Sequence, residues 1–343
     1  MRGETTGVTQ RTRRSRRGRT EEPRSGSLRM VSPSRKILHS GDHMYAITGA
    51  TGNTGKIIAD KLLGARQKVR VIGRSAEKLQ LFVAKGAEAF VGSVDDAEAM
   101  ARAFTGAKAV FAMIPPDMKS KDFRAQQDRT SDAMAAAIEK AGVSHVVLLS
   151  SVGADKPEKT GPIAGLYQFE QKLNKIGALN ALYLRPGYFM ENLLPQIGVV
   201  KSMGMMAGPL KGDLALPMIA TRDIGEYAAG AITALNFKGK QTRELLGARD
   251  VAMKHAAAIV GAAIGKPNLS YTHAPAMMLK PAMVGMGMSG NVVDLILEMA
   301  DAFNSGYAKA LEARAPENTT PTTLEWFAEN VFAPAFGGKA ASA

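Results

Sequence analysis

The chain has 343 residues, and its hydrophobic fraction of 45% and charged fraction of 22% are typical of a soluble globular protein. It contains no cysteine, which excludes disulfide bonds, thiolate catalysis and cysteine metal sites. No run of about 18 apolar residues predicts a transmembrane helix, and the five histidines lack the spacing of metal ligands, so neither a membrane span nor a metal site is expected. These features favour a cytoplasmic protein.

The net charge of +13 is concentrated at the N-terminus. Residues 1–43 hold 11 Lys and Arg against 4 Asp and Glu, a net +7, which leaves +6 for the other 300 residues. This segment has almost no aliphatic side chains and is therefore expected to be a disordered basic tail. A nucleic-acid arm, a targeting peptide and a localisation signal are functional alternatives, but a true translation start at Met44 is favoured. No nucleic-acid binding is expected of the folded body, which has no basic patch interleaved with aromatic residues.

From Met44 onward, short apolar runs alternate with helical periodicity, which predicts parallel β/α units. Six strands are predicted, at Tyr45–Thr48, Val69–Ile72, Ala89–Val91, Ala109–Met113, His145–Leu149 and Ala181–Leu184. The helices expected between them are Thr54–Leu63, a helix ending at Leu81, Ala97–Ala103, Phe123–Lys140 and Ile163–Ile176. Beyond them we expect helices at Arg222–Leu235, Val251–Ile264, Asn291–Asn304 and Pro321–Val331, with short strands at Arg243–Leu246 and Leu269–Thr272.

The turn after the first strand has the pattern of a dinucleotide-binding loop. Gly49, Gly52 and Gly55 recur at three-residue spacing between an apolar strand and an amphipathic helix. The first glycine permits a tight turn, the second lets the backbone approach a pyrophosphate, and the third lets the helix pack closely on the strand. The residues predicted to bind the cofactor here are Gly49, Thr51, Gly52, Asn53, Thr54 and Gly55.

The short connections predict an α/β fold with a doubly wound, Rossmann-like parallel sheet of order 3-2-1-4-5-6. Its ligand crevice is expected at the carboxyl ends of the first and fourth strands, where the order reverses. The further residues expected to line it are Arg74, Met113, Ile114, Pro115, Ser150 and Ser151. Residues 44–187 are predicted to form the NAD(P)-binding core, residues 188–335 a small, mostly helical substrate lobe interleaved with it, and residues 336–343 a frayed tail.

Arg74 decides the predicted cofactor. An NAD site usually places Asp or Glu about 20 residues past the glycines, whereas the second strand here ends in Gly73-Arg74-Ser75. A guanidinium can bind the 2′-phosphate of NADP(H) bidentately. NADP(H) is therefore the preferred cofactor, with NAD(H) as the alternative.

With these residues in place, the chain resembles the NmrA-like branch of the atypical short-chain dehydrogenase/reductases. The resemblance rests on the glycine loop, on Gly73-Arg74, and on the segments 141–151, 184–192, 221–225 and 321–327. It implies an NAD(P)-binding Rossmann fold that serves either as a reductase of quinones or similar carbonyls or as a redox sensor. It also carries an adenine contact over to Ser93, in the place of the usual Asp, and cofactor contacts to Pro186 and Gly187.

One departure from the wider family concerns its catalytic dyad. Ordinary short-chain dehydrogenases pair a tyrosine with a lysine four residues later, whereas here Tyr167 is followed by Gln171 at that spacing and Lys172 comes one residue late. An offset of five residues rotates the lysine by roughly 140° around the helix, so the dyad is predicted to be broken. Tyr167 and Ser151 remain the candidate catalytic donors, and Tyr188 and Asn192 the candidate substrate contacts.

Methionines crowd two segments of the C-terminal half, one at residues 203–206 and one at residues 277–288. Thioethers suit an adaptable apolar pocket or a loosely specified core. Gly285, Gly287 and Gly290 predict a mobile lid rather than a rigid helix.

Two function classes follow. The favoured one is an NADPH-dependent oxidoreductase that reduces a quinone or similar electron-poor carbonyl without the dyad. The alternative is a non-enzymatic NAD(P) redox sensor that acts on a protein partner. The expected partner is accordingly a small-molecule acceptor or a regulatory protein, and not a membrane.

Overall fold

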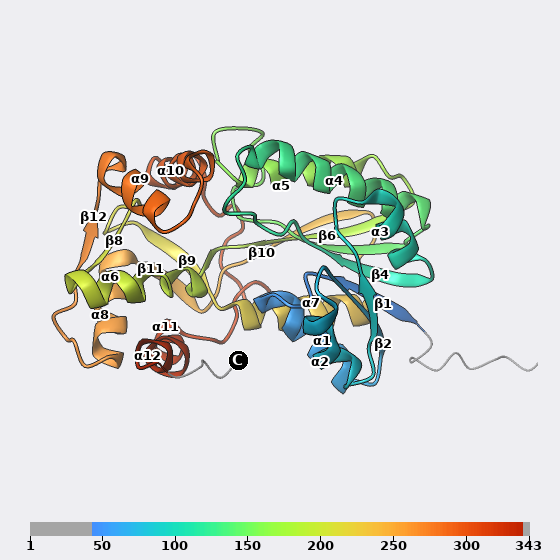
Figure 1. Cartoon of the computed structure of the whole chain (residues 1–343), viewed down its shortest axis with the longest axis horizontal. Coiled ribbons are helices and arrows are strands. Elements are labelled where there is room, and N and C mark those ends of the chain that lie inside the picture. The colour runs from blue at the N-terminus through green and yellow to red at the C-terminus, as the bar shows by residue number, and fades with distance from the viewer. Residues whose placement is uncertain (1–42, 339–343) are drawn as a thin grey trace, which may run out of the picture. The chain divides into compact units, whose positions relative to one another are not determined.

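A computed structural model describes residues 43–338, so the predicted tails, apart from His43 and residues 336–338, lie outside the described residues. Its main feature is a seven-stranded parallel sheet (Figure 1). The strands are β1 (Met44–Thr48), β2 (Lys68–Gly73), β3 (Glu88–Val91), β4 (Ala107–Ala112), β5 (His145–Leu149), β6 (Asn180–Pro186) and β10 (Lys240–Leu245). Their order is β10-β6-β5-β4-β1-β2-β3. The predicted order 3-2-1-4-5-6 is confirmed, and β10 extends it by pairing in parallel with β6.

Helices cover both faces of this sheet (Figure 1). On one face lie α1 (Asn53–Gly64), α2 (Ala76–Val83) and α7 (Thr221–Ala234); on the other lie α3 (Ala97–Phe104), α4 (Phe123–Lys140) and α5 (Ile163–Asn174). Successive residues of a strand point to opposite faces, so Ala46 and Ile47 of β1 enter two different hydrophobic cores. Burial on both faces explains why the central strands β1 and β5 are largely apolar in sequence.

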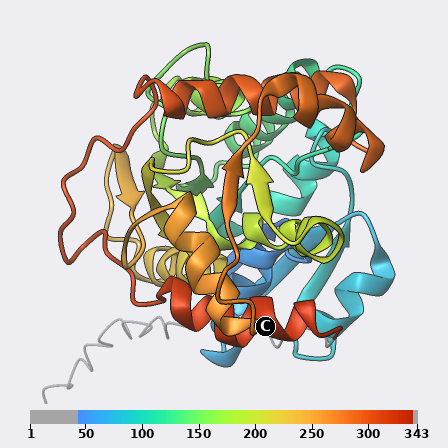
Figure 2. The ribbon, with the colours of Figure 1, turned by 90° about the vertical axis from the view of Figure 1, so that its left-hand side faces the viewer.

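The remaining elements form a C-terminal lobe with a third hydrophobic core. A three-stranded sheet has the order β11-β9-β7, and β8 pairs with β12 in a second, parallel sheet that faces the viewer in Figure 2. The strands are β7 (Tyr188–Phe189), β8 (Met206–Gly208), β9 (Ala215–Ile219), β11 (Arg249–Ala252) and β12 (Tyr271–His273). The helices are the 3₁₀ turn η1 (Met190–Leu193), α6 (Gln196–Met203), α8 (Met253–Ala263), α9 (Ala276–Gly285), α10 (Gly290–Asn304), α11 (Leu324–Phe327), the π-helical stretch η2 (Ala328–Phe332) and α12 (Ala333–Phe336).

Several predicted elements differ from the structure: the helix expected over Pro321–Val331 begins only at Leu324 and becomes π-helical at Ala328, and the strand expected over Leu269–Thr272 is Tyr271–His273. The helix expected over Val251–Ile264 starts only at Met253, because the residues before it pair with β9 as strand β11. The segment expected to be a lid rather than a rigid helix contains helix α9, which ends at Gly285 and buries none of its residues. No helix among residues 43–338 is long and apolar enough to cross a bilayer.

Candidate functional site

The three glycines of the loop have the geometry that the spacing predicts. Gly49 has a φ of +63°, in the left-handed region that favours glycine, and its carbonyl oxygen accepts a hydrogen bond of 2.9 Å from the Gly52 N–H. A Cβ atom at Gly55 would lie 2.3 Å from the carbonyl oxygen of Gly49. Helix α1 therefore approaches the end of β1 more closely than any residue with a side chain permits.

The N-terminus of α1 is open. At the N-termini of α2, α3 and α4, a side chain accepts a hydrogen bond from a backbone N–H of the first turn. The capping residues are Ser75, Asp96 and Asp122, respectively. The cap of α1 is Gly52, which offers no side-chain acceptor, and Thr51, Gly52 and Asn53 are exposed. N–H groups at such a terminus and the helix dipole together suit a phosphate, and the residues present therefore fit the pyrophosphate of a dinucleotide.

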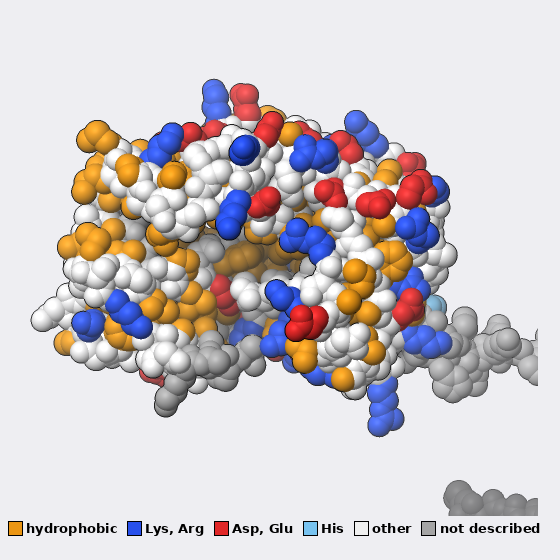
Figure 3. All heavy atoms as spheres, in the orientation of Figure 1, with side chains coloured by type: hydrophobic (Ala, Val, Ile, Leu, Met, Phe, Trp, Pro, Cys, Tyr) orange, Lys and Arg blue, Asp and Glu red, His pale blue; other side chains and the backbone are white. Residues whose placement is uncertain are grey.

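The strand ends beside this loop are fixed by Thr48, the last residue of β1. Its buried hydroxyl donates to the Phe111 carbonyl at 2.9 Å and accepts the Met113 N–H at 3.2 Å, which joins β1 to β4 where the strand order reverses. The Met113 side chain lies against Gly49, with its sulfur 2.7 Å from where a Cβ would stand. In the orientation of Figure 1, the surface of the molecule is hollowed near its middle, and hydrophobic side chains lie at the bottom of the hollow (Figure 3).

The residues predicted to meet the adenosine half of the cofactor lie at the ends of β2 and β3. Arg74 is exposed and forms no hydrogen bond or ion pair with any described residue. Ser93 is half-buried, two residues beyond β3, and the N–H of Gly92 donates to the Gly73 carbonyl at 3.0 Å. Arg70, on the same strand as Gly73, is instead bonded to Glu88 and to two backbone carbonyls. Among the described residues, Arg74 is thus a cation that remains available at this edge.

Ser150 and Ser151 follow β5 and have different surroundings. The Ser150 hydroxyl is buried and donates to Glu170 of α5 at 2.6 Å, so it is committed within the protein. The Ser151 hydroxyl is half-buried and donates only to the neighbouring Val152 carbonyl, at 3.0 Å. Of the two hydroxyls, that of Ser151 is the one that can turn to a ligand.

Glu170 is the centre of a buried charged network that sequence reasoning missed. Its carboxylate accepts two hydrogen bonds from Arg185 of β6, at 3.0 and 2.5 Å, besides that from Ser150. Burial is the largest single influence on the pKa of Arg185 and acts to lower it, but the hydrogen bond to Glu170 and the negative charges of Glu170, Asp155 and Glu244 together raise that pKa above its ordinary value. The sequence held one sign of this network, which is the charged Arg185 in a mostly apolar strand. A buried cation requires a buried partner of opposite charge.

Tyr167 and Lys172 point to different surroundings on α5. The Lys172 ammonium lies 2.7 Å from Asp132 and donates to Ser131 at 2.8 Å, both on α4. Tyr167 is half-buried, and its hydroxyl makes no hydrogen bond to any described residue. The contacts of Lys172 support the prediction that the two do not act as a pair.

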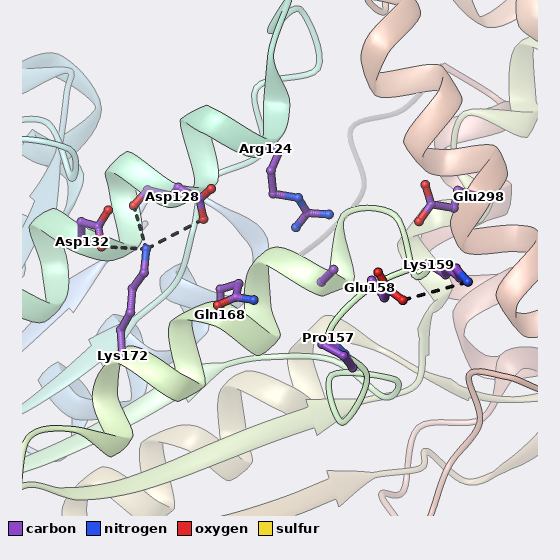
Figure 4. Close-up of a pocket in the computed structure, with 10 residues that line it drawn as sticks. Arg124, Asp128, Asp132, Pro157, Glu158, Lys159, Gln168, Lys172 and Glu298 are labelled. Carbon is purple, nitrogen blue, oxygen red and sulfur yellow. Dashed lines mark hydrogen bonds and ion pairs between the residues drawn. The ribbon is translucent and has the colours of Figure 1, made fainter.

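Lys172 also lines a surface groove of about 550 Å³ between α4, α5 and the loop at Pro157–Lys159 (Figure 4). Both signs of charge line this groove, which receives Arg124, Asp128 and Asp132 from α4 and Glu298 from α10. None of the predicted site residues lines it. The groove is therefore lined by other residues than those of the crevice predicted at the carboxyl ends of the strands.

The residues predicted to contact substrate lie at the beginning of the C-terminal lobe, directly after β6. Tyr188 lies in β7, pairs with Met218 of β9 and packs against the core of the lobe, and burial raises its pKa. Asn192 is exposed, and its side chain makes no hydrogen bond within the described chain. Its neighbour Glu191 accepts bonds from the Thr221 N–H and hydroxyl, the latter at 2.6 Å. Burial raises the pKa of Glu191, although its bonds to Thr221 oppose that shift.

Besides the hydrogen bonds between Glu191 and Thr221, a second pair of hydrogen bonds joins distant segments at Asp223. The buried Asp223 carboxylate accepts the Thr322 N–H at 2.9 Å and the Thr322 hydroxyl at 2.6 Å. Three segments far apart in sequence, at Glu191, Thr221–Asp223 and Thr322, are thus bonded in series. These residues hold the C-terminal lobe against α7.

We expect Asp223→Asn to lower the free energy of unfolding by about 1–3 kcal/mol, because the amide replaces one acceptor of two buried hydrogen bonds by a donor. Urea denaturation followed by circular dichroism measures the change. Asp213→Asn is the matched control, since Asp213 is exposed and forms no bond with any described residue. Equal stability of the two variants would contradict the assigned role of Asp223.

The comparisons with known proteins agree with this architecture. The family model described as "NmrA-like family" matches residues 42–328. The NAD(P)H azoreductase of Xenophilus azovorans is 28% identical over 269 residues, which cover 78% of this chain and 87% of that protein. Quinone oxidoreductase 2 of Escherichia coli is 26% identical over 262 residues, 74% of this chain and 86% of the relative.

Solved structures show the same fold. A crystal structure of an NADPH-dependent quinone oxidoreductase from Escherichia coli complexed with NADPH has a TM-score of 0.66 at 20% identity, covering 88% of this chain and 96% of that one. The negative transcriptional regulator NmrA in complex with NAD has a TM-score of 0.63 at 17% identity, covering 87% and 98%. The Rossmann-like fold class is thereby confirmed, and with the family model matching most of its length, the chain belongs to the NmrA-like family.

Proposed function

We propose that this protein is an NAD(P)H-dependent oxidoreductase that prefers NADP(H) and reduces a quinone or a similar electron-poor carbonyl. The observation that carries the proposal is the open N-terminus of α1, held against the end of β1 by Gly49 and Gly55 at the point where the strand order reverses. The reductase and oxidoreductase names of the two curated relatives support the class of reaction.

The chain's own residues would hold the cofactor along the carboxyl ends of the strands. The glycine loop, with Thr51, Asn53 and Thr54, would bind the pyrophosphate, Arg74 the 2′-phosphate and Ser93 the adenine side. Met113, Ile114 and Pro115 after β4, the turn at Ser150, and Pro186 and Gly187 after β6 would line the other half. When bound, the nicotinamide supplies the hydride, and the protein supplies binding, orientation and electrostatics.

Toward the acceptor, the protein would offer hydroxyl donors rather than an activated dyad. The Ser151 hydroxyl and the Tyr167 phenol are the two candidates, and Tyr188 and Asn192 extend the site on the side of the C-terminal lobe. Quinones suit such a site, because the anion formed on hydride addition is well stabilised and needs no strong general acid. Two hydrogen-bond donors on the acceptor oxygen would then suffice.

The proposal predicts turnover with electron-poor acceptors. Purified protein with NADPH should oxidise the cofactor when a quinone is added and should do so much less with a simple aliphatic aldehyde. The loss of absorbance of the reduced nicotinamide measures this, with a panel of benzoquinones, naphthoquinones, an azo dye and aldehydes.

A redox sensor is the second candidate. Its supporting observation is that Lys172, the lysine nearest to Tyr167 in sequence, is bonded to Ser131 and Asp132 instead. Tight NADP⁺ binding with no turnover of any acceptor would favour this reading and contradict the first. A cytoplasmic location and either kind of partner remain predictions from sequence.

A further inference from the structure

Glu170 is a buried carboxylate to which the proposed function assigns no role. It is 2% exposed and lies on α5, three residues beyond Tyr167, so the two side chains share one side of the helix. Its three hydrogen bonds come from residues of two other elements, Ser150 after β5 and Arg185 in β6. The helix and both strand ends therefore meet at this one side chain.

The same strand ends carry the candidate catalytic hydroxyl. The Ser150 N–H donates to the Leu184 carbonyl at 2.7 Å, and the Val152 N–H donates to the Pro186 carbonyl at 3.0 Å. Ser151 thus lies between two residues whose backbones are fixed to β6. The Ser150 side chain is fixed as well, at 2.6 Å from Glu170, so the backbone direction that sets the Ser151 hydroxyl depends on that carboxylate.

Resting on the proposed function, we propose that Glu170 is a positioning residue of the reductase site: it fixes Ser151 and Tyr167 relative to one another through Ser150, Arg185 and its own helix. Glu170 touches neither cofactor nor acceptor in this scheme. Its charge is balanced by Arg185, whose guanidinium also donates to the Ala154 carbonyl at 3.2 Å, so the loop after Ser151 is held by the same network. The groups that contact the acceptor remain the hydroxyls of Ser151 and Tyr167.

The test is Glu170→Gln, which keeps the size of the side chain but places an amide N–H₂ opposite the Ser150 hydroxyl or Arg185. We expect kcat for a quinone to fall roughly 10- to 100-fold, since small misplacements of catalytic groups cost rates of this order. The Kd for NADP⁺ and the KM for quinone should each change less than about threefold, because neither ligand contacts Glu170. A general loss of packing would alter kcat, KM and Kd together.

Two further variants make the test specific. Ser150→Ala leaves the Glu170–Arg185 ion pair in place and removes only the link to the end of β5, so it should lower kcat in the same way and serves if Glu170→Gln does not fold. In a double-mutant cycle the two changes should not be additive, because both break one link. Asp223→Asn is the matched control, a buried carboxylate in a structural tie that touches no predicted site residue.

The outcomes separate the two proposals. Turnover in the unsubstituted protein with full kcat in folded Glu170→Gln or Ser150→Ala would overturn the positioning role alone. So would additive effects in the cycle, or an equal fall of kcat in Asp223→Asn. No turnover in the unsubstituted protein would overturn both the positioning role and the reductase function.

Discussion

Gly55→Ala should weaken NADP⁺ binding roughly 5- to 150-fold, the range that corresponds to an overpacking cost of about 1–3 kcal/mol. The added Cβ would stand 2.3 Å from the Gly49 carbonyl oxygen and 2.7 Å from its carbon, and both are backbone atoms. Relief therefore requires α1 to move away from β1. That movement displaces the helix N-terminus and the turn at Gly52, which are the groups proposed to hold the pyrophosphate.

The same helix provides the control. Gly64 is the last residue of α1, and a Cβ placed on it meets no atom within 4 Å. Gly64→Ala should leave the Kd unchanged and keep or raise the stability, since alanine favours a helix over glycine. Isothermal titration calorimetry with NADP⁺ measures both variants. Tight binding by Gly55→Ala would show that the close approach of α1 does not matter for the cofactor.

Arg74→Asp should reverse the cofactor preference. Loss of a charge-assisted bond to the 2′-phosphate costs about 1.5–3 kcal/mol, a fall of roughly 10- to 100-fold in NADP⁺ affinity. The new carboxylate would also repel the phosphate, while it could accept bonds from the free ribose hydroxyls of NAD⁺. The exposed Arg74 has no partner among the described residues, so its replacement should leave the fold unchanged.

Lys78→Asp makes a like change of charge one helical turn further on, at another exposed residue, whose backbone N–H donates to the Ser75 hydroxyl at 3.3 Å but whose side chain bonds to no described residue. Its effect should be a small, salt-dependent loss of NADP⁺ affinity, because solvent screens charges that make no direct contact. Affinities for NADP⁺ and NAD⁺ measured side by side in the two variants decide the matter. An unchanged ratio in Arg74→Asp would remove the basis for preferring NADP(H).

The loop at Gly49–Gly55 was predictable in detail because its determinants are local. A positive φ at Gly49 and the contact of Gly55 with Gly49 involve residues within one strand-to-helix turn, and the spacing of the glycines encodes them. The lobe strands were harder: β7 has two residues and β8 three, too few to show a period of two. Their formation depends on pairing with β9 and β12, which are distant in sequence.

The sequence by itself determined the α/β class and the order of the first six strands, because periodicity, glycine conformation and right-handed crossovers act over short stretches of chain. Only the tertiary structure showed which polar side chains are engaged in hydrogen bonds and ion pairs within the protein. Ser150, Glu170 and Arg185 meet across three elements, and Asp223 reaches Thr322 over 99 residues. Buried charge must find a partner wherever the fold brings one, and no spacing rule encodes that choice.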